Sequence, residues 1–278
     1  MKRLLISLLA VVVALTACQN NKPKHKLTII HVNDTHANLE PMRAGDMAGM
    51  GGALERAAYI DSVLKADGPE NVLLLHAGDF SQGTSYFAEF GVPLMVEVLN
   101  AMKYDVATLG NHEFDNGLEG LDAALQQCEI PITVCNYDFS PFEMGKIIKP
   151  YVIVEKAGLK IGVVGVLCDL TKLVQGDIFN RLPEKDMNTA LQSTVDEIRD
   201  QCDLVIALTH IGLEEHNPGD KLDTDLAAAT RGIDLFIGGH SHTFLEKPVY
   251  VKNLDGKKIP IVQDGWAGSY MGEMHLEL

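Results

Sequence analysis

Short apolar runs and amphipathic segments alternate along most of the chain. Residues 72–75 consist of Val-Leu-Leu-Leu, a continuous apolar run that is typical of a strand buried on both faces. In residues 51–66, by contrast, apolar positions recur at helical spacing, which predicts an amphipathic helix. Because the two kinds of segment follow one another repeatedly, the pattern predicts an α/β fold.

The predicted elements cover the chain from residue 26 onward. Strands are predicted over residues 26–32, 72–75, 106–109, 132–135, 204–208 and 235–237. Helices are predicted over residues 51–66, 93–102, 118–127, 188–201 and 224–230. A hairpin is expected from residues 151–154 and 160–167, and two or three antiparallel strands from residue 248 onward, around residues 255–256. No repeat or linker interrupts this sequence, so we expect one domain over residues 26–278.

The first residues have a different pattern. A basic start, Met1-Lys2-Arg3, precedes an apolar run over residues 4–17. That run is shorter than the ~20 residues that a membrane-spanning helix needs, and it predicts a secretory signal peptide over residues 1–17. It ends in Leu-Thr-Ala-Cys, which resembles the bacterial lipobox. Cys18 is therefore the predicted lipid attachment site, residues 18–25 the linker, and the protein an exported one anchored to a bacterial membrane, at its periplasmic face or the cell surface.

Composition and charge narrow the function classes. The 278 residues are 46% hydrophobic and 22% charged, which excludes a disordered or fibrous chain. The formal net charge of −15 argues against a nucleic-acid-binding surface.

The five cysteines do not indicate a specific function. Apart from Cys18 they are Cys128, Cys135, Cys168 and Cys202, and no C-x-x-C pair indicates a zinc site. An exported protein can form disulfides, but the sequence does not choose among the three possible pairings. We interpret these four residues as small buried apolar side chains.

Polar residues directly follow five of the predicted strands. These residues are Asp34, His36, Asp79, Asn111, His210, His240 and His242. The carboxyl ends of strands are where α/β sheets bind ligands, and imidazole, carboxylate and amide groups bind divalent metal ions. Seven ligands suit two ions that share one carboxylate. A lone histidine is more often structural, and we give this interpretation to five of the six other histidines, all except His112: His25, His31, His76, His216 and His275.

The motifs around these residues resemble a known family. Five motifs together are similar to those of the calcineurin-like metallophosphoesterases. They are Asp34-x-His36, Gly78-Asp79, the run from Gly110 to Glu113, His210 and the run from Gly239 to His242. Residues 104–115, 149–154 and 238–243 resemble its 5′-nucleotidase branch, which includes periplasmic UDP-sugar hydrolases. The resemblance covers about residues 26–278.

This resemblance implies a four-layer α/β/β/α sandwich with mixed sheets and a centre of two divalent ions, such as Zn, Mn or Mg. It assigns one ion to Asp34, His36, Asp79 and His242, and the other to Asp79, Asn111, His210 and His240. Asp79 would bridge the ions, and a metal-bound hydroxide would attack phosphorus in line. His112, oriented by Asp115, would donate to the phosphoryl oxygen or the leaving group.

Two departures from the family pattern bear on the substrate. His242 stands where several 5′-nucleotidases have Gln, and the sequence ends at Leu278, where the family's C-terminal substrate domain would follow. Two interpretations follow: a separately encoded specificity domain is a partner, or the substrate is small, such as a sugar phosphate, and needs no such domain.

The expected function is hydrolysis of phosphoric monoesters, in particular nucleoside 5′-monophosphates. Three alternatives stay open. One is a phosphodiesterase acting on 2′,3′-cyclic nucleotides or nucleotide sugars, and another is a thiosulfate-processing hydrolase. The third is a non-enzymatic surface-binding lipoprotein.

Overall fold

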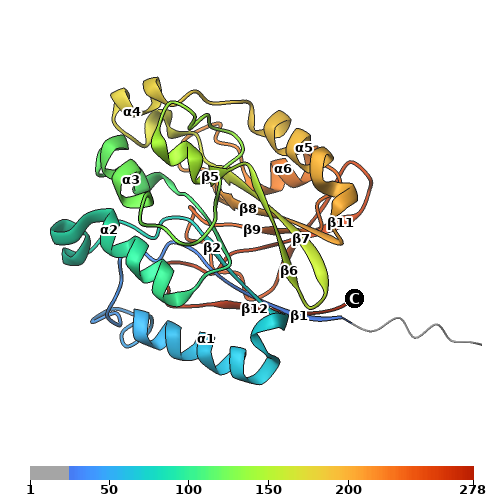
Figure 1. Ribbon diagram of the computed structural model, residues 1–278, viewed down its shortest axis with the longest axis horizontal. Coiled ribbons are helices and arrows are strands. Elements are labelled where there is room, and N and C mark those ends of the chain that lie inside the picture. Colours follow the sequence, from blue (N-terminus) through green and yellow to red (C-terminus); the bar gives the residue numbers. More distant parts are fainter. Residues whose placement is uncertain (1–24) are drawn as a thin grey trace, which may run out of the picture.

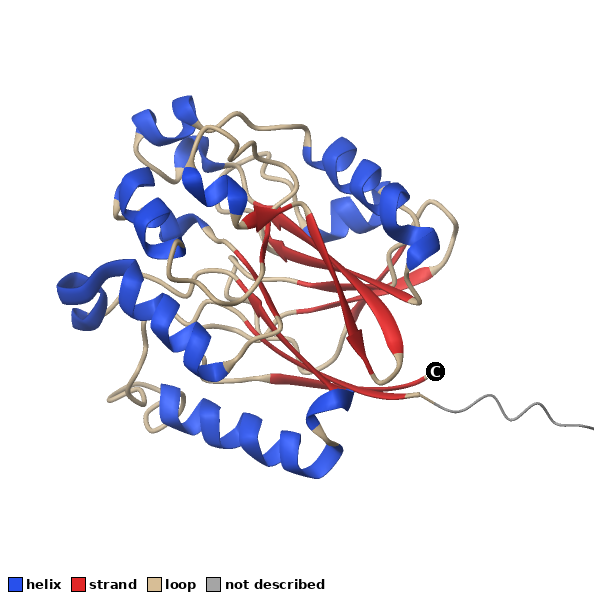
Figure 2. Ribbon diagram, in the orientation of Figure 1, coloured by secondary structure: helices blue, strands red, loops and turns tan. Residues whose placement is uncertain are grey.

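The computed structural model describes residues 25–278, and it consists of two stacked β-sheets flanked by helices (Figures 1 and 2). Cys18 and the predicted signal peptide lie outside the described residues. Within the described part of the chain, no helix combines the length and the apolarity needed to cross a membrane. The backbone groups of His25 and Leu278 are hydrogen-bonded to each other, so both ends of the described chain lie at one edge of the domain.

The first sheet has the strand order β12-β1-β2-β3-β4-β5. Five of its strands are parallel to one another: β1 (Lys26–Val32), β2 (Val72–Ala77), β3 (Val106–Thr108), β4 (Ile132–Thr133) and β5 (Ile148–Lys149). The sixth, β12 (Gly272–Glu277), runs antiparallel to β1. This sheet is therefore mixed, as the resemblance implied.

The second sheet has the order β10-β11-β9-β8-β7-β6. Its parallel centre consists of β11 (Lys258–Val262), β9 (Leu235–Ile237), β8 (Leu204–His210) and β7 (Leu159–Leu167). An antiparallel strand closes each edge, and these two are β10 (Val249–Lys252) and β6 (Tyr151–Lys156).

Helices cover the outer faces of both sheets (Figure 2). Those that pack on the first sheet are α1 (Ala53–Asp67), α2 (Ser85–Met102) and α3 (Gly117–Leu125). Those on the second sheet are α5 (Met187–Ile198) and α6 (Asp223–Ala229), and α4 (Gly176–Arg181) precedes them along the chain. Short 3₁₀ helices are η1 (Pro69–Asn71), η2 (Asn111–Phe114), η3 (Glu143–Lys146), η4 (Leu170–Lys172) and η5 (Arg199–Gln201).

Alternation along the strands builds two kinds of core. In β1, Leu27 and Ile29 point between the sheets, where they share a buried cluster with Ile161 and Ile206 of the second sheet. Ile30 lies on the opposite face of β1 and belongs to the core under the helices. Because successive strand side chains face opposite ways, one strand supplies both cores. The four-layer sandwich is confirmed.

Several helices and strands differ from the sequence-based expectation, and among them strand β5 was not predicted. Helix α2 begins at Ser85 instead of residue 93, and its two segments meet at Gly91, where φ is 64°. Pro93 disfavours a helical conformation just before it, so the pattern predicted only the second segment. Strand β12, expected beside the hairpin that β10 and β11 form, instead crosses to pair with β1 of the other sheet. Helix α4 was not predicted at all.

All four cysteines in the described part of the chain are free. Cys135 and Cys168 are buried, whereas Cys128 and Cys202 are partly buried. Burial raises the pKa of the Cys135 thiol to about 12. The interpretation as small packed side chains is therefore confirmed for Cys135 and Cys168.

The two sheets come into backbone contact at Gly165 of β7. Its carbonyl accepts a hydrogen bond from Cys135 N, just beyond β4. A Cβ atom at this position would lie 1.9 Å from the Thr133 carbonyl oxygen. Only glycine therefore allows the sheets to meet here.

Gly165→Ala should destabilise the domain by about 1–3 kcal/mol or more, because the new methyl group must push the two strands apart. Chemical denaturation monitored by circular dichroism measures this change. Gly176→Ala is the matched control, since a Cβ there meets only ordinary contacts with the Phe179 ring. Equal unfolding free energies for the two variants would contradict the argument.

Candidate metal centre

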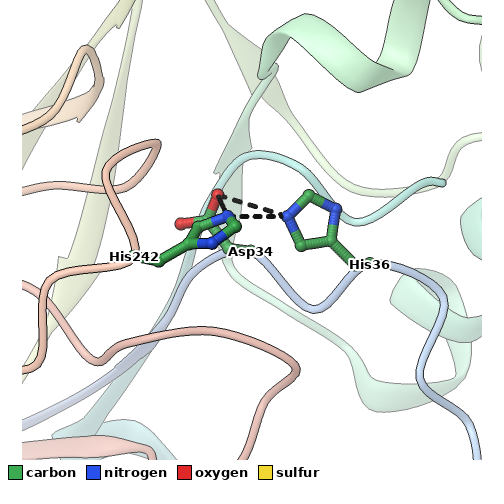
Figure 3. A group of neighbouring side chains, drawn as sticks. All are labelled: Asp34, His36 and His242. Carbon is green, nitrogen blue, oxygen red and sulfur yellow. Dashed lines mark hydrogen bonds and ion pairs between the residues drawn. The ribbon is translucent and has the colours of Figure 1, made fainter. Parts of the chain in front are cut away.

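The loops that follow β1 and β9 bring three ligand atoms together. One atom from each of Asp34, His36 and His242 lies within 4.8 Å of the others. Figure 3 shows the imidazole rings of His36 and His242 turned toward each other beside the Asp34 carboxylate. The two Nε2 atoms are 2.9 Å apart, and Asp34 Oδ1 is 3.5 Å from His242 Nε2 and 3.7 Å from His36 Nε2.

A second group lies directly beside the first. Its members are Asp79, which follows β2, His210, which ends β8, and His240, which follows β9. One ligand atom from each lies within 4.8 Å of the others, and all three residues are buried. Asp79 Oδ2 is 3.2 Å from His210 Nε2 and 3.9 Å from His36 Nε2. Asp34 Oδ1 is 3.8 Å from His210 Nε2. Both carboxylates therefore face both groups.

Hydrogen bonds to the backbone set the tautomers of two histidines. His210 Nδ1 lies 2.7 Å from Ala77 O and His36 Nδ1 lies 3.2 Å from Ser81 O. A carbonyl accepts a hydrogen bond, so each Nδ1 is the donor and each Nε2 faces the site. His210 Nε2 is buried and faces Asp79 Oδ2 at 3.2 Å. Nε2 atoms facing carboxylates fit a bound cation, and a carbonyl on Nδ1 is the usual support of a metal-binding histidine.

The electrostatics of this pocket favour positive charge. Burial disfavours charged His210, but the Asp79 and Asp34 carboxylates outweigh it and raise the pKa of His210 to about 10. Burial alone would raise the pKa of Asp79, yet His210, together with His36 and His112, more than compensates and lowers it. Burial, with His210 next, lowers the pKa of His240 to about 3, which leaves that imidazole neutral as a metal ligand must be.

The backbone at the candidate ligands is held in an unusual conformation. Positive φ angles occur at Asp34, His36, Asp79, His240 and His242, with values from 45° to 80°. Side-chain-bearing residues rarely adopt this region, and each case costs about 1–3 kcal/mol that the surrounding structure must offset. Such strain concentrates at functional sites, which is independent support for a functional centre here.

Comparisons with known proteins agree with this geometry. The family model described as calcineurin-like phosphoesterase matches residues 27–244. The chain belongs to this family. Its members are phosphoester hydrolases.

Relatives and solved structures refine the placement within the calcineurin-like phosphoesterases. A 5′-nucleotidase from Homo sapiens is 33% identical over 276 aligned residues, which cover 91% of this chain and 46% of that protein. The crystal structure of a 5′-nucleotidase precursor from Thermus thermophilus matches with a TM-score of 0.81 and 29% identity, covering 90% of this chain and 51% of that one.

The structure of the Haemophilus influenzae NAD nucleotidase matches with a TM-score of 0.80 and 27% identity, covering 92% of this chain and 48% of that one. The present chain thus spans about half the length of the relatives that it matches.

The remaining sequence-predicted residues of this phosphoesterase domain lie next to the two groups. Asn111 is buried at the start of η2, and its Oδ1 is 3.8 Å from the Cys168 thiol. The backbone N–H of His112 donates to Asp79 Oδ1 at 2.9 Å, which leaves Oδ2 to face His36 and His210. His112 Nδ1 is 2.9 Å from Asp115 Oδ2, as predicted for an oriented imidazole.

His112 differs from the candidate ligands in its surroundings. Its side chain is 31% exposed, and its ring meets that of His36 edge-on at 5.4 Å. Burial lowers the pKa of His112, but the hydrogen bond to Asp115 and the nearby Asp79 charge raise it by more, so the net shift is upward. The imidazole therefore tends to hold its proton at the open side of the site.

Two supporting residues were given no role from the sequence. Asn33 donates to Asp34 Oδ2 at 2.5 Å and to Gly265 O at 2.7 Å, which ties the β1 loop to the segment before β12. Glu113 is fully buried and accepts from three backbone N–H groups, those of Asp79, Ser81 and Gly110. Both residues are adjacent to predicted ligands, but their partners are set by tertiary contacts.

Two more neighbours come from outside the predicted motifs. The His216 ring lies 4.3 Å from that of His240, and its Nε2 is 3.1 Å from His240 O, although its sequence context indicated only a structural histidine. The Trp266 indole stacks on His242 at 5.7 Å with an interplanar angle of 12°. No local sequence signal distinguished either residue.

Glu113→Gln should weaken metal binding by about 10- to 100-fold, a typical cost of losing a group that supports ligands. The amide nitrogen cannot accept a hydrogen bond, so at least one of the three backbone N–H groups of Asp79, Ser81 and Gly110 loses its acceptor. Competition against a chelator measures the affinity, and circular dichroism checks the fold.

Glu119→Gln is the control, because Glu119 lies on the surface of α3, where it pairs with Arg181. Wild-type affinity in Glu113→Gln would show that the loops hold their geometry without this carboxylate.

Proposed function

We propose that residues 26–278 form the catalytic domain of a metal-dependent phosphomonoesterase of the 5′-nucleotidase type, hydrolysing nucleoside 5′-monophosphates to nucleosides and phosphate. The observation that carries this proposal is the direct contact between the two ligand groups. Asp34 and Asp79 each face histidines of both groups at 3.2–3.9 Å. A pair of adjacent metal sites is the arrangement that phosphatases use.

The donor set fits two divalent ions. Asp34, His36, Asp79 and His242 would hold one ion, and Asp79, Asn111, His210 and His240 the other, with Asp79 shared. The mixed nitrogen and oxygen donors suit Zn, Mn or Fe better than Ca. When bound, such ions supply Lewis-acid charge that stabilises the phosphoryl group as negative charge develops on it.

His112 would act on the substrate directly. Its Nδ1 proton is held by Asp115, so Nε2 is the atom available to the substrate. A protonated Nε2 can donate to a phosphoryl oxygen or to the departing alkoxide. Because His112 is partly exposed whereas His210 is fully buried, His112 is the better placed to meet an incoming ester.

The substrate class rests on the relatives. Proteins named 5′-nucleotidase and NAD nucleotidase share this domain, which supports a nucleotide substrate. Since these relatives are about twice as long, we infer that part of their substrate selectivity depends on surfaces outside the matched region.

The deciding experiment is hydrolysis of AMP, p-nitrophenyl phosphate, 2′,3′-cyclic AMP and NAD by the metal-loaded protein, with chelator-treated protein as control. Release of phosphate from AMP that needs Zn²⁺ or Mn²⁺ supports the proposal. Preference for the cyclic nucleotide or NAD would make the protein a diesterase or a pyrophosphatase instead. No metal-dependent hydrolysis of any ester would overturn it. The ratio of turnover with AMP to turnover with p-nitrophenyl phosphate measures how strongly these residues favour a nucleoside as the leaving group.

His112→Ala should lower the rate by about 10²–10⁴, the usual contribution of a proton donor, and leave the metal content near that of the wild type. Asp79→Asn is the contrasting variant, since losing the shared anionic charge should lower both metal content and rate. Metal analysis and steady-state kinetics test the pair. Loss of metal from His112→Ala would reassign His112 as a ligand.

We further propose that the protein is exported and anchored through a lipid on Cys18. Cys18→Ser should release it from membranes or block its maturation, which fractionation and mass spectrometry of the mature N-terminus would report. An unmodified mature N-terminus at another residue would contradict this.

A further inference from the structure

Gln263, which directly follows β11, is bonded to the loop after β9 at three points. The residue is fully buried. Its Nε2 donates to Gly239 O at 2.6 Å. Its Oε1 accepts from Ser241 Oγ at 3.0 Å and from Thr243 N at 2.5 Å. One amide group therefore holds three alternate residues of this loop.

The candidate ligands His240 and His242 occupy the two positions between these three residues. Their φ angles are 80° and 54°, in the left-handed region that side-chain-bearing residues rarely adopt. This conformation costs free energy that neighbouring contacts must offset. The Gln263 amide makes a bond on either side of each histidine, so it opposes relaxation of the loop toward ordinary backbone angles.

The three bonds need a side chain that both donates and accepts. The Gly239 carbonyl can only accept a hydrogen bond and the Thr243 N–H can only donate one, which fixes the orientation of the amide. An ionised carboxylate offers no donor, and a thioether offers no donor and a weak acceptor. Neither glutamate nor methionine would therefore reproduce this set of bonds.

Backbone pairing fixes the position from which the Gln263 side chain extends. Leu245 N donates to Gln263 O at 3.1 Å, and Gly265 N donates to Thr243 O at 3.0 Å. Both bonds belong to a short antiparallel bridge between the two segments. The amide is therefore held from its own backbone as well as by its partners.

The residues after Gln263 reach the other loop of the first ligand group. Asp264 N donates to Asn33 Oδ1 at 2.8 Å, and Ala267 N donates to Asp34 O at 2.7 Å. One short segment, residues 263–267, thus connects the loop after β1 to the loop after β9.

We propose that Gln263 is a positioning residue of the metal centre, whose amide fixes the loop from which His240 and His242 reach the ions. The two histidines belong to different ligand groups. Loss of the amide should therefore weaken the binding of both ions. This inference rests on the proposed function, since it requires that both groups hold an ion.

Gln263→Met tests this role, because it keeps a similar side-chain length and removes the amide. With Co²⁺ as the probe, affinity should fall about 10- to 100-fold at both sites, the usual cost of losing a group that supports ligands. At saturating Co²⁺ the visible absorption spectrum should also differ from that of the wild type, because it reports ligand geometry. A loss of fold stability alone would leave the saturated spectrum unchanged.

Gln192→Met is the matched control. The Gln192 amide of α5 also makes three hydrogen bonds, two with the backbone of Arg231 and one with Asp196. None of these partners belongs to a ligand loop, so Co²⁺ affinity and spectrum should be those of the wild type. Equal changes in the two variants would overturn the proposal, as would wild-type affinity and spectrum in Gln263→Met.

Hydrogen exchange of the wild-type chain decides the question if Gln263→Met does not fold. Coupling is reciprocal, so bonds that favour metal binding are strengthened when the metal binds. The Thr243 amide, which donates to Gln263, should exchange more slowly with Zn²⁺ bound than after chelator treatment. The Arg231 amide, which donates to Gln192, should exchange equally in both. An unchanged rate at Thr243 would overturn the proposal.

The results also separate this inference from the proposed function. A wild-type chain that binds no Co²⁺ would contradict the metal centre and the inference together. If the wild type binds two Co²⁺ ions and hydrolyses AMP, and Gln263→Met does both equally well, the positioning role alone is overturned.

Discussion

Two buried carboxylates, those of Asp34 and Asp79, both face His36 and His210, and the architecture of this end of the domain follows from that placement. Like charges buried together are unfavourable unless positive charge joins them. In the metal-free protein, His210 provides this positive charge, as its raised pKa indicates. Divalent ions carry two positive charges each and can therefore stabilise the carboxylates more strongly. The affinity for cations is therefore built into the fold rather than added at its surface.

Hydrogen bonds from neighbouring groups hold the two carboxylates in place despite the repulsion between their negative charges. Asp34 accepts from Asn33 and from the backbone N–H of His240, and Asp79 accepts from the backbone N–H of His112. Gly239 lets the loops meet, since a Cβ there would lie 2.6 Å from Ala77 O and 2.8 Å from His210 Nδ1. The left-handed backbone at five candidate ligands persists because these neighbours leave no alternative.

The alternation of strands and helices and the candidate ligand positions were predicted from local signals, whereas the four layers were implied by the family resemblance. An apolar run marks a buried strand, and a polar residue at its end, such as Asp79, has no reason in packing to be there. The roles of Glu113 and Asn33 were not predictable, since their partners come from loops that only the folded sheets bring close. The crossing of β12 escaped prediction for the same reason: strand pattern does not say which sheet a strand joins.

Exposure divides the centre into two sides. Asp34, Asp79 and His210 are buried, whereas the His242 and His112 side chains are 39% and 31% exposed. An ester must therefore approach from the side of His112 and His242, with its phosphoryl group toward the carboxylates and its leaving group toward solvent. In the proposed reaction, the residues named here would contact the phosphoryl group, and the nucleoside would extend toward solvent. Selection of the nucleoside would then depend on other surfaces, which is consistent with one domain occurring in relatives that are named for different nucleotide substrates.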